Sequence, residues 1–137
     1  MRNKGFLFLL FAFILGFSSH LNAQNENIHF AFFVDTETNV YKDLNNRLIM
    51  NFTISNVADQ ADLDNITYKF EHYGVFENVQ FTPTTDNGVY AVYTISKPGV
   101  RVKDQRKLFV SCGIFTLFID DQPYPTENFT VLMMNNN

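Results

Sequence analysis

Cysteine and tryptophan are almost absent from this sequence of 137 residues, which has one cysteine and no tryptophan. A single thiol cannot form an intramolecular disulfide, nor can it supply the several thiolates of a structural zinc site. Basic residues are also few, since 10 Lys and Arg stand against 14 Asp and Glu, for a formal net charge of −4. Nucleic-acid binding needs clustered Lys and Arg, so this charge balance argues against a nucleic-acid partner.

Long hydrophobic runs are missing as well, apart from one near the start of the chain. Arg2 and Lys4 precede an apolar run from Phe6 to Phe17, which is followed by the small-residue end Leu21-Asn22-Ala23-Gln24. This order is typical of a secretory signal peptide, and the run is shorter than the roughly 20 residues that span a bilayer. We therefore predict a signal peptide at residues 1–23, cleaved between Ala23 and Gln24, and a secreted or periplasmic protein with no membrane span in its mature form. An uncleaved membrane anchor is the alternative.

The rest of the chain has the length of one domain and begins with two predicted strands. The short aromatic run Ile28–Val34 is typical of a strand, either paired with the next strand, at a sheet edge, or in a flexible extension. A polar segment follows, and Leu48–Ile54 then alternates with a period of two. The period changes to that of a helix at Leu63, Ile66, Phe70 and Tyr73, with Ser55 or Asn56 as its cap and Gly74 at its end.

The second half of the chain repeats this succession of elements. A strand is predicted from Val75 to Phe81, then a turn with the Asn87-Gly88 signal of tight hairpins, then a strand at Val89–Ile95. A second amphipathic helix carries Val102, Gln105, Phe109 and Cys112, and the strand Ile114–Ile119 follows it. From Leu48 onward the order is β-α-β-β-α-β, which predicts an α+β, ferredoxin-like sandwich with two helices on a four-stranded antiparallel sheet. We divide the chain into an N-terminal strand and loop at 24–47, the ferredoxin-like domain at 48–126, and a tail or edge strand at 127–137.

The stretch Asn51–Phe81 resembles a heavy-metal-associated domain. Phe52-Thr53-Ile54-Ser55 corresponds to the first strand of that family, and Gly74-Val75 with Val79 and Phe81 corresponds to its second. The Asn- and Phe-rich composition, with a signal ending in Asn-Ala-Gln, also resembles secreted proteins of Bacteroidetes. Metal-carrying members of the family have a Cys-x-x-Cys before the first helix, where this chain has Asp59 and Asp62. Carboxylates are hard ligands and do not replace thiolates for Cu(I), so the resemblance implies the fold without the metal site.

Other candidate functional residues are scattered along the chain. His29 lies in a predicted strand, His72 lies near the end of the first helix, and Cys112 lies on the buried face of the second. Asp59, Asp62 and Cys112 are the candidate metal ligands, and Met50, Met133 and Met134 would be soft ligands if they converged. There is no nucleophile elbow and no phosphate-binding glycine loop. A small hydrolase would have to use Asp59, Asp62 or His72 in a concave pocket.

These observations favour a binding module rather than an enzyme, with no cofactor. The expected partner is a protein, which would add a strand to an exposed sheet edge at Ile28–Val34 or Phe129–Leu132. The alternative is a periplasmic metal-binding carrier that uses Cys112, a histidine or the methionines.

Overall fold

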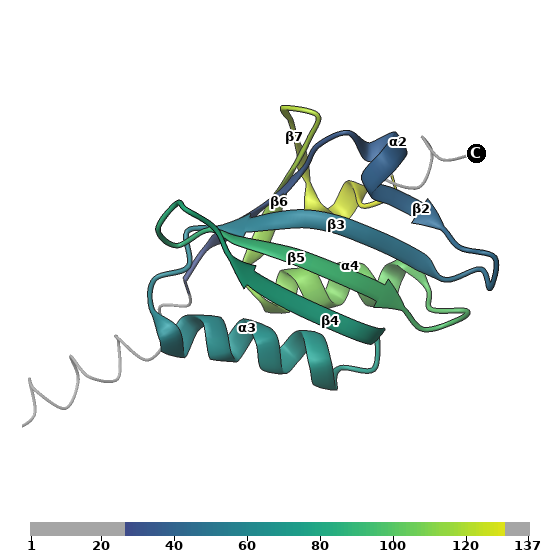
Figure 1. The fold of residues 1–137 in the computed structure, drawn as a ribbon, viewed down its shortest axis with the longest axis horizontal. Helices are drawn as coiled ribbons and strands as arrows, with labels where there is room; N and C mark the ends of the chain where they lie inside the picture. Colours follow the sequence, from purple (N-terminus) through teal and green to yellow (C-terminus); the bar gives the residue numbers. More distant parts are fainter. Residues whose placement is uncertain (1–26, 131–137) are drawn as a thin grey trace, which may run out of the picture.

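A computed structural model describes residues 27–130 as one α+β unit built on a single sheet (Figure 1). The predicted signal peptide at residues 1–23, and Met133 and Met134, lie outside the described residues. The strands are β1 (His29–Phe33), β2 (Val40–Lys42), β3 (Leu48–Ser55), β4 (Phe76–Pro83), β5 (Tyr90–Ser96), β6 (Ile114–Ile119) and β7 (Gln122–Pro125). The helices are α2 (Thr36–Asn39), α3 (Gln60–His72) and α4 (Val102–Ser111), with a 3₁₀ turn, η1, at Thr126–Asn128.

The sheet is mixed, and its strand order is β4-β5-β3-β1-β6-β7. Strands β1 and β6 run parallel, whereas every other paired strand is antiparallel to its neighbour. The short strand β2 also pairs with β3, opposite Leu48–Met50, while β1 pairs with β3 opposite Thr53–Ser55. Strands β1 and β2 therefore lie end to end along β3, and α2 is an excursion between them.

Both long helices pack on the same face of the sheet, and phenylalanine rings fill the space between. Phe52 of β3 has its ring centroid 6.5 Å from that of Phe70 on α3 and 5.6 Å from that of Phe109 on α4. The rings of Phe70 and Phe109 meet edge to face at 5.5 Å, and both side chains are fully buried. Aromatic pairs in this geometry add to the stabilisation that their burial already gives. Six of the 16 phenylalanines are buried in this core: Phe33, Phe52, Phe70, Phe76, Phe109 and Phe129.

Helix α3 begins and ends with side-chain and backbone features that the sequence carries. Asp59 is its N-cap, because the carboxylate accepts a hydrogen bond from the N–H of Asp62. The cap predicted at Ser55 or Asn56 is wrong, since Ser55 still belongs to β3 and the amide of Asn56 donates to the carbonyl of Ile28. The helix ends before Gly74, which has a positive φ of 75° as predicted.

The predicted ferredoxin-like architecture is wrong. The sheet has seven strands and is mixed, instead of four antiparallel strands, and the described part of the chain has three helices. The physical reason is β1, which inserts between β3 and β6 and pairs with both, so those two strands are not neighbours. The fold that the resemblance to heavy-metal-associated domains implied is corrected by the same finding.

The two sheet edges that we expected to accept a partner are also not edges. Strand β1 is central, and Phe129 follows η1 with its side chain fully buried 5.1 Å from the ring of Phe109. Residues 131 and 132 lie outside the described part of the chain. The strands at the two ends of the strand order are β4 and β7, and the three-residue β2 also has a partner on one side only.

Candidate functional site

Three of the residues singled out in the sequence meet around His29, at the start of β1. Its Nδ1 lies 2.6 Å from the carbonyl oxygen of Cys112 at the end of α4, and its Nε2 lies 2.7 Å from Oδ2 of Asp62 in the first turn of α3. The side chains of His29 and Asp62 are 3% and 6% exposed. A carbonyl oxygen only accepts hydrogen bonds, so Nδ1 carries a hydrogen and donates it.

Asp62 is the negative partner in this contact. Burial is the largest influence on its pKa and acts to raise it, because a charge is costly in an apolar interior. The hydrogen bonds from the Ala58 N–H and the His29 imidazole outweigh burial and hold the pKa of Asp62 below its ordinary value. This buried contact between Asp62 and His29 joins the first turn of α3 to the start of β1.

This convergence does not create a metal site. Asp59 caps α3, Asp62 binds His29 and the Ala58 N–H, and Cys112 contributes its backbone carbonyl. Within residues 27–130, no group of three or more His, Cys, Asp or Glu side chains is placed to hold a metal ion. The structure gives these three candidate metal ligands, Asp59, Asp62 and Cys112, hydrogen bonds that support the fold.

The other candidates are far from this cluster or differently engaged. His72 is exposed and stacks on Tyr68 at 4.3 Å, while its Nδ1 lies 2.9 Å from the Tyr68 carbonyl oxygen. Met50 is fully buried in the core. The pocket that a hydrolase using Asp59, Asp62 or His72 would need does not gather these three, because the hollow beside Asp59 and Asp62 lacks His72.

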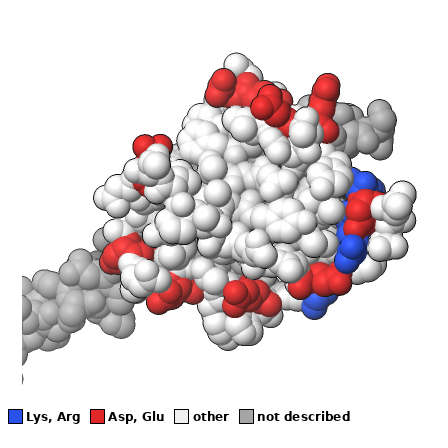
Figure 2. Space-filling view, in the orientation of Figure 1, with Lys and Arg blue, Asp and Glu red and all other residues white. Residues whose placement is uncertain are grey.

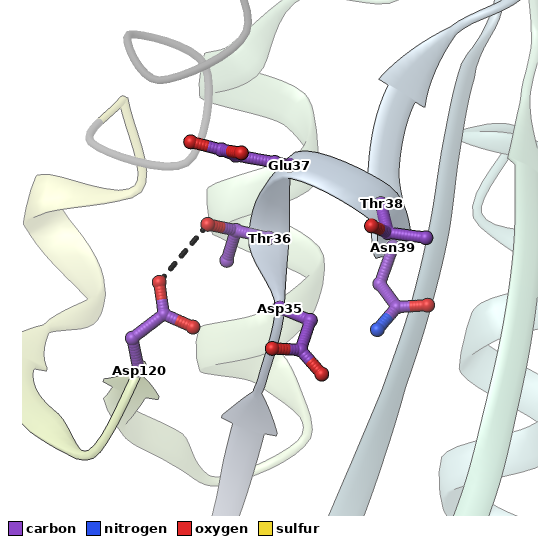
Figure 3. Close-up of a pocket in the computed structure, with 6 residues that line it drawn as sticks. All are labelled: Asp35, Thr36, Glu37, Thr38, Asn39 and Asp120. Atoms are coloured by element: carbon purple, nitrogen blue, oxygen red, sulfur yellow. Dashed lines mark hydrogen bonds between the residues drawn. The ribbon is translucent and has the colours of Figure 1, made fainter.

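An open acidic hollow of about 480 Å³ lies at the opposite end of β1 (Figure 3). Its walls come from α2 with the preceding residue and from the turn after β6: Asp35, Thr36, Glu37, Thr38, Asn39 and Asp120. The hydroxyl of Thr36 donates to Oδ2 of Asp120 at 3.1 Å, which ties the two walls together. Asp35 and Asp120 have positive φ angles of 46° and 48°, so both carboxylates lie in tight turns. Of the side chains that line this hollow, Thr36 is buried, whereas the carboxylates of Asp35, Glu37 and Asp120 are exposed.

The largest unusual surface is the face of the sheet that the helices do not cover. The pairing register places alternate residues of neighbouring strands on this face, for example Phe32 beside Thr53 and Phe118, and Asn51 beside Tyr93. The full set on this open face, as we name it, is Phe30, Phe32, Tyr41, Ile49, Asn51, Thr53, Ser55, Asn78, Gln80, Thr82, Ala91, Tyr93, Ile95, Thr116, Phe118, Pro123 and Pro125. None of these side chains is charged.

Aromatic rings cluster at one side of the open face. Phe32 and Phe118 stack across the parallel strands β1 and β6 at 4.7 Å, and Phe30 meets Phe118 edge to face at 6.0 Å. All three side chains are half-buried rather than buried. A sheet face in contact with water normally carries polar and charged residues, so this composition departs from the usual alternation.

Charged residues surround the open face without entering it (Figure 2). The view onto this face shows an uncharged centre, with Asp and Glu around most of the periphery and Lys and Arg at one end only. At the β2–β3 turn, the guanidinium of Arg47 is bound to the carboxylates of Asp43 and Glu77, at 2.7 Å and 3.2 Å. Arg47 is thus already neutralised, and the border of the open face is predominantly acidic.

The sequence contained the signal for this face. In β1 and β3, the residues that point to the helices and the residues that point to the opposite face all lack Asp, Glu, Lys and Arg. The sequence therefore indicates two uncharged sheet faces, although a core needs only one. This pattern did not by itself predict an exposed face, because Ile28–Val34 was compatible with a paired strand, an edge strand or a flexible extension.

Comparison with family models, with curated proteins and with solved structures found no match to this chain. No relative therefore tests the resemblance to heavy-metal-associated domains, which stays a prediction. No helix among residues 27–130 is long and apolar enough to cross a membrane.

Proposed function

We propose that this protein is a non-enzymatic binding module that binds another protein through the open face of its sheet. The observation that carries the proposal is the uncharged, aromatic centre of this face inside a charged border. Protein interfaces have this anatomy, because charged residues are depleted at their buried core and concentrated at their solvated rim. A location outside the cytoplasm, predicted from residues 1–23, would place the partner in the periplasm or beyond.

The charge of the border indicates the chemistry of the partner. Since Asp and Glu dominate it, a second copy of the chain would bring acidic borders together, and like charges across an interface are unfavourable. A protein with an uncharged apolar surface bordered by Lys and Arg would instead match both the centre and the acidic border of the open face. We therefore expect a basic-bordered partner protein.

The metal-carrier alternative has no such support within the described residues. Cys112 is buried, and the His29 ring nitrogens are both engaged in hydrogen bonds. Met133 and Met134 lie outside the described residues.

The test places a charge in the centre of the open face. The variant Tyr93→Lys puts an ammonium where the partner's apolar surface would lie, while the half-exposed position lets the monomer fold. The variant Leu44→Lys is the matched control, because Leu44 is fully exposed in the turn before β3 and is not on the open face. Wild type and both variants are used as bait with periplasmic extract, and each captured protein is then purified and titrated by calorimetry.

A partner that uses the open face binds wild type and Leu44→Lys alike but binds Tyr93→Lys at least about thirtyfold more weakly, the loss of a central interface residue. Equal affinity of all captured proteins for the three baits would overturn the proposal. Self-association of wild type that Tyr93→Lys abolishes would also overturn it, since the partner would then be a second copy.

A further inference from the structure

Apart from the three-residue β2, the strands with an open edge are β4 and β7, and these two differ in their ability to accept another strand. Strand β7 is four residues long and contains Pro123 and Pro125, which lack an N–H and so interrupt any added ladder. Strand β4 is eight residues long, with its one proline at the last position and a bulge between Phe76 and Asn78. Between them, the stretch Asn78–Thr82 is regular and has neither proline nor charge. Of the two edges, β4 is therefore the one without the usual protection against strand addition.

The backbone groups on the outer side of β4 can be identified from the hairpin that it forms with β5. The N–H of Thr84 donates to the carbonyl of Val89, so residue 84 faces β5. Backbone groups alternate in direction along a strand, so Gln80 and Thr82 also face β5, whereas Val79 and Phe81 face outward. Pro83 belongs to the outward set, which agrees with its lack of an N–H. Within the described part of the chain, no hydrogen bond reaches the outward backbone groups of Val79 or Phe81.

Helix α3 extends beyond this edge of the sheet. In Figure 1 it lies outside β4, on the side away from β5, so part of the helix has no strand beside it. The helix flank with Asp62 and Lys69 contacts β1 and the end of α4, through His29 and the Ser111 carbonyl. Helical periodicity therefore places Leu63 and Thr67 on the other flank, toward the β4 edge. Leu63, Val79 and Phe81 are partly buried and pack against the core, so their burial is incomplete on this side.

We propose that β4 accepts an extended segment of a partner protein as an additional strand, which lies beside β4 and over α3. The open backbone groups of Val79 and Phe81 define the occupant, because only another extended backbone matches their spacing. This edge adjoins the open face at Asn78, Gln80 and Thr82, but the outward backbone groups of Val79 and Phe81 belong to the edge alone.

The side chains at the edge specify the pattern of the added segment. On the helix side, apolar side chains next to Val79 and Phe81 would complete the burial of the apolar group there. On the open face, the neighbours are Asn78, Gln80 and Thr82, which favour uncharged polar residues. The only charge on β4 is Glu77, and the chain is acidic overall, so the segment should be neutral or basic. The expected ligand is a stretch of five to seven residues that alternates apolar and uncharged polar side chains, a length of about 17 to 24 Å.

The probe is a capped, fluorescently labelled peptide with the sequence Tyr90–Ser96, flanked by lysines for solubility. This segment already pairs with β4 on its inner side, where Val92 lies opposite Phe81 and Thr94 lies opposite Val79. The control peptide is identical except for N-methyl groups at Val92 and Thr94, which remove the N–H donors that would face Val79 and Phe81. We expect the unmodified peptide to shift the amide resonances of Val79 and Phe81 in the purified protein and the control peptide to bind about tenfold more weakly or worse.

Two measurements on the protein complete the test. In the free protein, the amides of Val79 and Phe81 should exchange with deuterium faster than those of Gln80 and Thr82, which are bound to β5. The variant Val79→Pro removes one outward N–H and should lose peptide binding, whereas Val79→Ala, which keeps this N–H, should retain it. Since proline substitution can impair folding, the N-methylated peptide gives the same information on the unaltered protein.

Three results would overturn the inference: equal binding of the two peptides, no binding at millimolar concentration, or slow exchange of Val79 and Phe81 in the monomer. A dimer of the free protein that Val79→Pro dissociates would overturn it as well, because the occupant would then be the β4 strand of a second copy. Peptide binding by the Tyr93→Lys variant separates this surface from the open face.

Discussion

At the residue scale, the interior of this protein contains one carboxylate–imidazole pair. His29 and Asp62 are the only buried side chains of the Asp, Glu, His, Lys and Arg type among residues 27–130. They join the first strand to the first turn of α3, and the Nδ1 hydrogen of His29 adds the end of α4. Three elements that are distant in the sequence are held together by one imidazole ring.

The variant Asp62→Asn should therefore be strongly destabilised. It replaces the buried carboxylate that binds the His29 ring and the Ala58 N–H, and breaking one side of a buried pair costs about 3–5 kcal/mol of unfolding free energy. The control Asp64→Asn changes an exposed carboxylate on the same helix, which only accepts a hydrogen bond from Gln60, and should have almost no effect. Urea denaturation at neutral pH measures both.

The same pair gives a direction for the pH dependence. The pKa of Asp62 is lowered by folding from its ordinary value of 3.8, so the unfolded chain binds more protons between the two pKa values. The stabilisation is complete above pH 3.8 and is lost as the pH falls through the lower folded pKa. The difference in stability between wild type and Asp62→Asn should accordingly shrink below pH 3.8. A difference that is constant down to pH 2 would contradict an ionised Asp62.

At the element scale, both long helices end before a glycine with a φ of 75°, but the surroundings of the two glycines differ. A Cβ on Gly74 would meet nothing within 4 Å. A Cβ on Gly113 would overlap the carbonyl oxygen of Asn27 and lie 3.4 Å from Nδ1 of His29. The chain before β1 thus passes directly over the end of α4.

The variants Gly74→Ala and Gly113→Ala should distinguish the destabilisation caused by backbone strain from the destabilisation caused by steric overlap. Both place a side chain at positive φ, which costs about 1–2 kcal/mol. Gly113→Ala must in addition displace residue 27 or α4, so its unfolding midpoint should fall clearly further than that of Gly74→Ala. Equal midpoints in thermal or urea unfolding would show that the segment before β1 moves away without cost.

Individual elements were largely predictable from the sequence, because periodicity and terminal glycines are local signals. The predicted strand Ile114–Ile119 has the observed bounds, and the helix that carries Phe70 ends before Gly74 as expected. The segment after β1 was predicted as polar turns but forms α2 and β2. Val40 is the reason, since its side chain is fully buried and β2 extends the sheet along β3. One buried residue in a polar stretch is too weak a local signal to reveal this.

At the scale of the whole molecule, the sequence did not show which strands are neighbours. The alternation in β1, with Ala31 and Phe33 inward and Phe32 outward, is the same for a central strand and for an edge strand. Its parallel pairing with β6 depends on residues at the other end of the chain. The contact of His29 with Asp62 was invisible for the same reason, because it follows from the position of β1. Neighbour relations of this kind are tertiary and leave no local pattern.

The central place of β1 leads to a prediction about truncation. The chain Gln24–Asn137 should unfold cooperatively, whereas a chain that begins at Asp35 should not fold, because β3 and β6 would lose their common neighbour and the cluster at His29 would be removed. Calorimetry on both chains measures this. A cooperative transition in the shorter chain would show that β3 and β6 can close the sheet without β1.

The parallel pair at the centre of the sheet also affects how the chain reaches its native state. His29 and Cys112 are separated by 83 positions, and β1 cannot complete its pairing until β6 is present. Pairings that are distant in the sequence slow folding, since a long loop must close, at a cost in entropy, before the stabilising contacts can form. A growing chain therefore exposes β1, with its five consecutive uncharged residues, until nearly all of the described domain has been synthesised. The strand that holds the finished sheet together is thus the one most in need of protection from aggregation while the chain is incomplete.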